Sequence, residues 1–112
     1  MTSTRPDLEL KDDARELLVM QIPNEILNGF KLNDFEGRVG ISEPEFRTLA
    51  KALRSETRVV VNGEQALALR NALSEVMDEL TTEFQTRTGY YLSEASTVLR
   101  QLDDFIESQG VR

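Results

Sequence analysis

The chain of 112 residues has no cysteine, no histidine and no tryptophan, and only three prolines. Without histidine or cysteine it cannot form a Ser-His-Asp or Cys-His nucleophile, a disulfide, or the usual zinc, haem or iron–sulfur ligand sets. Only carboxylate, Lys, Tyr, Ser or Thr chemistry remains, or Mg²⁺ and Ca²⁺ held by oxygen ligands. The sequence also has no calcium-loop, phosphate-loop, dinucleotide-binding or nucleophile-elbow motif. We therefore predict no catalytic residue, no cofactor and no metal site, and we favour a non-enzymatic role.

Positive charge is also scarce, with 13 basic against 20 acidic side chains and a formal net charge of −7. This excess repels phosphodiester backbones, and the basic residues are spread along the chain, so we predict no nucleic-acid partner. No stretch approaches the roughly 20 apolar residues of a membrane span. No apolar run of the kind found in secretory signals follows the first residues. We expect no membrane partner and a cytoplasmic location.

The length is suited to one modest domain. A chain of this size buries roughly two-thirds of the surface that its unfolded form exposes, which is enough for a single core. We predict a flexible tail over residues 1–7 and one globular domain over residues 8–112.

Amphipathic helices dominate the pattern. Ser42 and Glu45 form a capping box that predicts a helix over Glu43–Arg54. Apolar stripes spanning about 140° and 120° of a helical wheel predict longer helices over 64–80 and 94–108.

Further signals concern the ends and breaks of helices. Ser93 is expected to cap the last helix, and Gly110 to stop it. Another helix should begin near Ala14 and break or kink at Pro23, which lacks an amide hydrogen. A short helical piece should then end at Asn28 and Gly29.

Extended structure is predicted in short pieces only. The β-branched run around Val59–Val61 is the best candidate for a strand, and Leu8–Leu10 is a second. We expect a weak strand or ordered loop over 30–40 and another extended piece over 83–88. The predicted fold is a predominantly helical α+β domain, with three to four amphipathic helices packed on a small sheet. The alternative is a mainly α bundle.

The two halves of the chain show a weak internal similarity. Phe35-x-x-Arg38-x-Gly40 recurs as Phe84-x-x-Arg87-x-Gly89, and Ile41-Ser42-Glu43 is followed later by Leu92-Ser93-Glu94. The expected order of elements also repeats as strand, helix, strand, helix. We therefore consider two pseudo-repeats, over residues 8–56 and 57–108.

Arg38 and Arg87 each precede a glycine, Gly40 or Gly89, and a capped helix. Unpaired amides at a helix N-terminus together with an arginine fork would suit an anion. These four residues are our candidate anion site. The alternative is that each arginine pairs with an acidic helix while the glycines supply turn geometry.

Six residues are candidates for an interface. Leu67 lies outside the apolar stripe of its helix, and of two adjacent tyrosines we expect one in the core and one exposed. The acidic residues sit near the C-terminus of the last helix, where the helix dipole disfavours them. Either a basic partner or a solvated face explains their position. The candidates are Leu67, Tyr90, Tyr91, Asp103, Asp104 and Glu107.

Two functions of different classes follow. The first is a non-enzymatic module that binds a protein partner or forms a homo-oligomer. The alternative is a small-molecule or anion binder, or an enzyme, that uses Arg38 and Arg87 together with Tyr90 or Tyr91. A third hypothesis, an acidic mimic of nucleic acid, predicts salt-sensitive binding to a cationic protein.

Overall fold

The computed structural model describes residues 6–110, which form a predominantly helical α+β fold around one hydrophobic core. Strands β1 (Leu8–Leu10) and β2 (Val59–Val61) pair antiparallel, with Leu8 opposite Val61, and form a two-stranded sheet. Both predicted strands are therefore confirmed. Most of the predicted tail lies outside the described residues, while Pro6 and Asp7 belong to neither helix nor strand.

The first half continues from β1 into one long helical run. It consists of α1 (Asp12–Arg15), a π-helical stretch η1 (Glu16–Gln21), α2 (Ile22–Asn24) and a second π-helical stretch η2 (Glu25–Gly29). Pro23 lies within this run and does not end it. The wide turns on either side are a known way for a helix to absorb a residue that cannot donate to the ladder.

Two helices complete the first half. The short α3 (Phe35–Val39) is followed by α4 (Glu43–Arg54), which has the predicted bounds. At the start of α4, the Ser42 hydroxyl accepts from the Glu45 N–H at 3.2 Å, and the Glu45 carboxylate accepts from the Ser42 N–H at 3.1 Å. The predicted capping box is confirmed.

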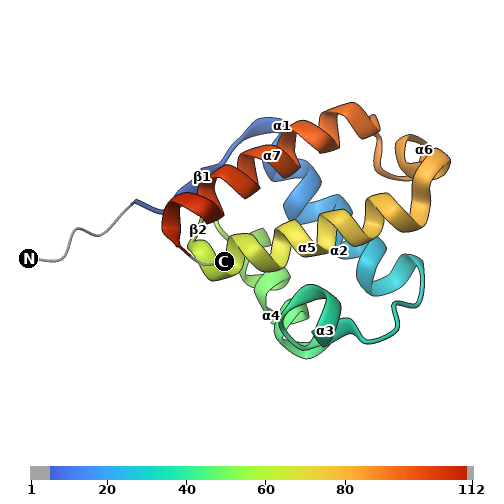
Figure 1. The fold of residues 1–112 in the computed structure, drawn as a ribbon, viewed down its shortest axis with the longest axis horizontal. Helices are drawn as coiled ribbons and strands as arrows, with labels where there is room; N and C mark the ends of the chain where they lie inside the picture. The colour runs from blue at the N-terminus through green and yellow to red at the C-terminus, as the bar shows by residue number, and fades with distance from the viewer. Residues whose placement is uncertain (1–5, 111–112) are drawn as a thin grey trace, which may run out of the picture.

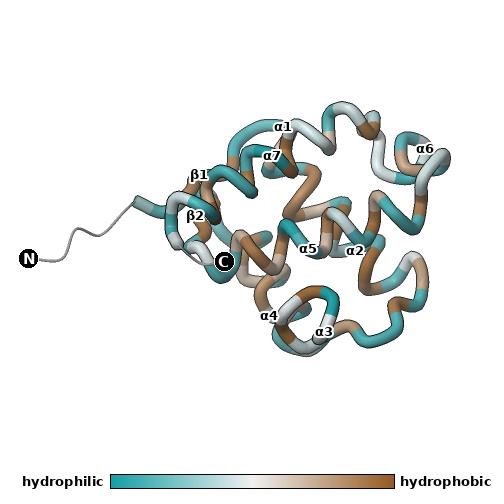
Figure 2. Tube along the Cα trace, in the orientation of Figure 1, coloured by the Kyte–Doolittle hydropathy of each residue, from teal (hydrophilic) through white to brown (hydrophobic). Residues whose placement is uncertain are grey.

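The second half contains the two longest α-helices. Its elements are α5 (Gly63–Leu80), the 3₁₀ turn η3 (Thr81–Glu83), the short α6 (Phe84–Thr88) and α7 (Leu92–Gln109). In Figure 1, α5 and α7 run side by side, and they form the most extensive helix–helix contact of the described residues. Figure 2 shows hydrophobic positions recurring at intervals along these helices, which is the pattern of elements that share one core.

Two of our predictions need correction. Of the weak strand or ordered loop expected over 30–40, residues 30–34 form a loop but 35–39 form helix α3, and the extended piece expected over 83–88 contains helix α6. Phe84 and Thr88 are four residues apart and both buried, which is helical spacing. The Thr88 hydroxyl donates to the Phe84 carbonyl oxygen at 2.8 Å, within the same turn. The alternation of apolar and polar residues over so short a segment did not distinguish a strand from a helix.

The expected cap of the last helix also needs correction. Helix α7 begins at Leu92, so Ser93 lies inside its first turn, and Tyr91 occupies the cap position. The Glu94 carboxylate accepts from the Tyr91 N–H at 2.9 Å. A side chain in the first turn thus satisfies the amide just before the helix.

The order of elements repeats, although not in the form expected. Each half contains a strand, a long helical run, a five-residue helix and a long helix. Both five-residue helices end at a glycine with positive φ, Gly40 at 101° and Gly89 at 85°. These glycines serve a backbone conformation that other residues rarely adopt.

Candidate functional site

The two arginines of the candidate anion site are paired with carboxylates of the chain itself. Arg38 on α3 lies 2.9 Å from the Glu75 carboxylate on α5. Arg87 on α6 lies 2.7 Å from the Glu25 carboxylate on η2 and donates to the Gly29 carbonyl oxygen at 3.2 Å. Each arginine therefore reaches the long helical run of the other half. The structure matches the alternative in which the arginines pair with acidic helices and the glycines shape turns.

The pair of Glu25 and Arg87 is the more buried of the two. The Glu25 side chain is 7% exposed and the Arg87 side chain 35%. The Arg87 N–H is not aligned with Glu25 Oε1, so the contact is an ion pair without a well-formed hydrogen bond. A Cβ added at Gly29 would collide with the Glu25 carboxylate and lie 2.7 Å from Arg87 Nη2. The small residue at this position leaves room for the pair.

The interface candidates do not gather in one place. Leu67 is partly buried against the core, and Asp103 pairs with Arg70 on α5 at 2.9 Å. Asp104 and Glu107 are exposed near the end of α7. With a rise of 1.5 Å per residue, they lie about 20 Å along the axis from the tyrosines that precede the helix.

The two tyrosines behave as a pair with different environments. Tyr91 is 62% exposed, whereas Tyr90 is partly buried against the core. The predicted exposure of one ring is confirmed. Tyr90 also lines a groove that the sequence did not reveal.

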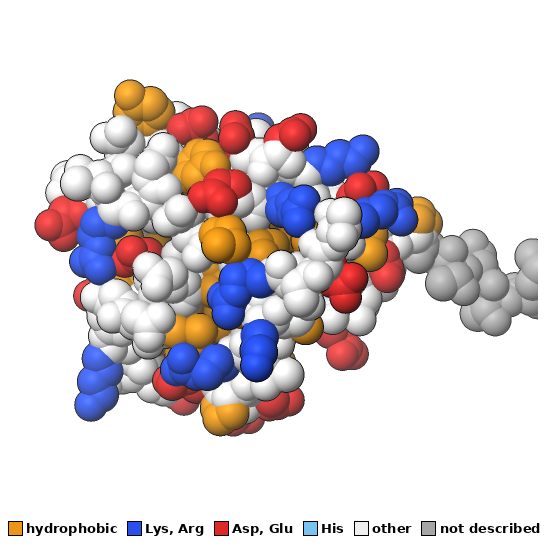
Figure 3. All heavy atoms as spheres, turned by 180° about the vertical axis from the view of Figure 1, so that it is seen from behind, with side chains coloured by type: hydrophobic (Ala, Val, Ile, Leu, Met, Phe, Trp, Pro, Cys, Tyr) orange, Lys and Arg blue, Asp and Glu red, His pale blue; other side chains and the backbone are white. Residues whose placement is uncertain are grey.

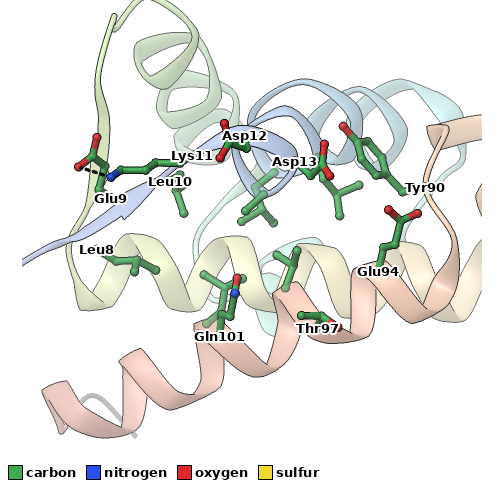
Figure 4. Close-up of a pocket in the computed structure, with 15 residues that line it drawn as sticks. Leu8, Glu9, Leu10, Lys11, Asp12, Asp13, Tyr90, Glu94, Thr97 and Gln101 are labelled. Carbon is green, nitrogen blue, oxygen red and sulfur yellow. Dashed lines mark ion pairs between the residues drawn. The ribbon is translucent and has the colours of Figure 1, made fainter.

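This groove lies between the N-terminal segment, formed by β1, α1 and η1, and helix α7, and it has a volume of ≈650 Å³ (Figure 4). Helix α7 contributes one stripe with the spacing i, i+3, i+4, i+7 and i+8. Most apolar residues of the groove belong to the buried core, while Leu8 and Ala14 are only partly buried. Those apolar residues are Leu8, Leu10, Ala14, Leu17, Leu18, Val98 and Leu102. The polar residues are Glu9, Lys11, Asp12, Asp13, Tyr90, Glu94, Thr97 and Gln101.

The strand end of the groove is electrically balanced. The Glu9 carboxylate lies 3.1 Å from Arg58 Nη2 and 3.8 Å from Lys11 Nζ. The hydrogen bond from Arg58, with the nearby positive charges, lowers the pKa of Glu9 below its ordinary value. At this end of the groove, the negative charge of Glu9 is therefore neutralised by Arg58 and Lys11.

The Tyr90 end is acidic. Figure 4 shows Asp13, from α1, and Glu94, from α7, both near Tyr90 at this end of the groove. Burial raises the pKa of Tyr90, and the charges of Asp13, Glu16 and Glu94 raise it further. Within residues 6–110, no Lys or Arg lies within ion-pair distance of Asp12, Asp13 or Glu94.

Asp12, at the middle of this rim, has a strained backbone. Its φ of 52° lies in the left-handed region, where a residue other than glycine is uncommon. The turn from β1 into α1 thus borders the groove in a conformation that local propensity does not favour.

A second, smaller hollow of ≈410 Å³ lies nearby and is lined by Asp12, Arg15, Glu16, Val19, Met20 and Arg54, so it holds both charge signs. On the face seen in Figure 3, basic side chains lie among acidic and apolar ones and form no surface of a single sign. Among residues 6–110, no three carboxylates converge in an arrangement that would hold a metal ion. None of the helices in this part of the chain is both long and apolar enough to cross a membrane.

Comparison with known protein families, with curated proteins and with solved structures finds no match to this chain.

Proposed function

We propose that this protein is a non-enzymatic interaction module that binds a segment of a partner protein in the groove between the N-terminal segment and α7. The observation that carries the proposal is the groove itself, an open hollow of ≈650 Å³ with an apolar floor and a polar rim. Concave apolar sites with a few convergent polar groups are the usual form of binding sites. The groups on this rim are carboxylates, hydroxyls, an ammonium and an amide, without a nucleophile–base pair.

The bordering strand supports a peptide as the occupant. Within the described residues, β1 pairs with β2 only, and β1 lines the groove along its whole length. The second edge of such a strand has backbone donors and acceptors open to a chain lying alongside it. A segment in the groove could therefore combine main-chain hydrogen bonds with burial of its apolar side chains.

Two other occupants are less well supported. An anion would have to displace the Glu75 carboxylate from Arg38, or the Glu25 carboxylate from Arg87. A second copy of the chain brings another net charge of −7, and the two copies repel each other at low ionic strength. We therefore favour a different protein as the partner.

The test is a selection of peptides from a random display library against the whole chain, followed by affinity measurements. Thr97→Trp and Gln101→Trp should fill the groove from exposed positions on its wall and weaken the selected peptides at least about tenfold, as steric blocking of a hot spot does. Ser96→Trp and Arg100→Trp place the same ring on exposed positions of α7 that do not line the groove, and should leave binding unchanged.

Two results would overturn the proposal. One is a selection in which every peptide binds all four variants as tightly as the natural chain. The other is light scattering that shows a concentration-dependent oligomer dispersed by Thr97→Trp and Gln101→Trp, because a second copy would then occupy the groove.

A further inference from the structure

We infer that the segment entering the groove is cationic and apolar: a Lys or Arg side chain is received between Asp13 and Glu94 beside the Tyr90 ring, and apolar side chains lie along the floor toward Leu10 and Leu102. This inference rests on the interaction function proposed above. It adds the chemistry of the partner and the direction in which the segment lies.

The arrangement of the acidic end supports a cation. Asp13 and Glu94 come from separate elements, α1 and α7, and Figure 4 shows both beside Tyr90 at the same end of the groove. A cation entering here would meet a carboxylate from each side of the groove, and charge-assisted hydrogen bonds to carboxylates are among the strong ones. The Tyr90 ring is partly buried and lines the same end of the groove, and an aromatic ring is a favourable neighbour for a cation.

The charges around Tyr90 also favour a cation at this end of the groove. Asp13, Glu16 and Glu94 all act on the Tyr90 hydroxyl, so their charges are close enough to add up there. In the described part of the chain, no basic side chain forms an ion pair with Asp13 or Glu94. A basic side chain of a partner would therefore meet carboxylates without an ion pair in this part of the chain, and the net charge of −7 favours its approach.

The opposite end of the groove indicates in which direction the bound segment lies. There, Arg58 and Lys11 already neutralise Glu9. A basic side chain placed at that end would meet two cations and gain no free carboxylate. The basic residue therefore belongs at the Tyr90 end, and the apolar residues belong over the leucines between the two ends.

The experiment uses the peptides that bind the natural chain and lose affinity in Thr97→Trp and Gln101→Trp. Each is compared with a synthetic copy in which its Lys or Arg is replaced by norleucine. Affinities are also measured for the double variant Asp13→Asn, Glu94→Gln, because the side-chain amide that Glu94→Gln introduces retains an oxygen acceptor for the Tyr91 N–H. The control Asp104→Asn, Glu107→Gln removes the same charge from exposed positions near the other end of α7.

We expect the selected peptides to carry a basic residue, and norleucine at that position to weaken binding about tenfold, in the range of a lost charge-assisted hydrogen bond. The double variant should bind the peptides more weakly than the natural chain by a similar factor, and high salt should reduce this difference in affinity. The control should change affinity less than about twofold, because its charges are screened at that distance. Groove-dependent peptides without a basic residue, or with equal affinity for both charge variants, would overturn this inference and leave the interaction function standing. A selection without any groove-dependent peptide would overturn both.

Discussion

The ion pair between Glu25 and Arg87 provides a sharp test of how the two halves are held together. Arg87→Met removes the guanidinium and keeps most of the stem that packs on the protein. The Glu25 carboxylate, 7% exposed, would then have no counter-charge. Removing one partner of a buried pair costs about 3–5 kcal/mol when both partners are fully buried.

The loss of stability expected for Arg87→Met is smaller than this, because water reaches Arg87, whose side chain is 35% exposed. Unit charges about 4 Å apart attract by about 4 kcal/mol at an effective dielectric constant of about 20, and by about 1 kcal/mol in bulk water. We expect Arg87→Met to lower the free energy of unfolding by about 2–3 kcal/mol, between these limits. For a chain of this length, that corresponds to a fall in Tm of roughly 10 °C.

The other half offers the matched control. Arg38 and Glu75 form the corresponding pair, but their side chains are 54% and 18% exposed. Arg38→Met should cost less than about 1 kcal/mol, as is usual for a solvated pair.

Urea denaturation of both single variants measures the difference. The double variant Glu25→Leu, Arg87→Met should recover most of the stability, because replacing both partners of a buried pair by apolar residues is often neutral. Equal losses in Arg87→Met and Arg38→Met would refute the argument that burial of Glu25 sets the cost. So would a double variant less stable than Arg87→Met.

Three further predictions concern single side chains. Ser42→Ala should lower the free energy of unfolding by about 1 kcal/mol in urea denaturation, because one cap hydrogen bond is lost. In Tyr91→Phe, which leaves Tyr90 as the single tyrosine, the ultraviolet absorbance of the phenolate should show a midpoint above 10.0. The neutral phenol is favoured by folding, so its contribution to stability should be lost as the pH rises through that midpoint; a midpoint at or below 10.0 contradicts the description of this end of the groove. A carboxyl NMR titration should give Glu9 a pKa below 4.5 that rises in Arg58→Met, and its stabilising contribution should disappear as the pH falls through the lowered value.

Much of the fold could be predicted because several signals are local. The capping box of Ser42 and Glu45 involves atoms three residues apart, and the helix behind it has the predicted bounds. The β-branched run Val59–Val61 forms β2 with both outer valines buried. The predicted stop at Gly110 also holds, with a φ of 69°. The sequence signals for these features are all local, although β2 itself is completed by pairing with β1.

The errors fall where a local pattern was too short or where tertiary contacts decided. Helices α3 and α6 are five residues each, so a period of two and a period of 3.6 give nearly the same apolar positions. At Pro23 the missing amide led us to expect a break or a kink; there is no break, because the run continues through two π-helical stretches, and Pro23 itself is buried. Burial of the flanking turns keeps the helix in place where propensity alone would end it.

The groove could not be predicted because no single element contains it. Helix α7 presents the same apolar stripe whether or not a second surface covers its edge. Only the packing of α7 along α5 leaves a hollow between its stripe and the segment from Leu8 to Leu18. Tyr90 was among the candidates, yet its acidic neighbours Asp13 and Glu94 come from sequence positions far apart.

The recurring Phe-x-x-Arg-x-Gly pattern did identify residues in matching surroundings, because each of the two arginines forms an ion pair with a glutamate of the other half. An arginine beside a glycine turn suits an external anion or an internal carboxylate equally well, and the local sequence does not distinguish them. The composition favours one of the two: with 20 acidic residues against 13 basic ones, carboxylates of the chain itself are the more available partners. A tethered carboxylate acts at an effective concentration in the millimolar range or above, so a dissolved anion must exceed that level to compete. In a strongly acidic small domain, arginines at such turns are therefore better interpreted as ties between elements, and the carboxylates that remain without a basic neighbour are the better guide to a binding surface.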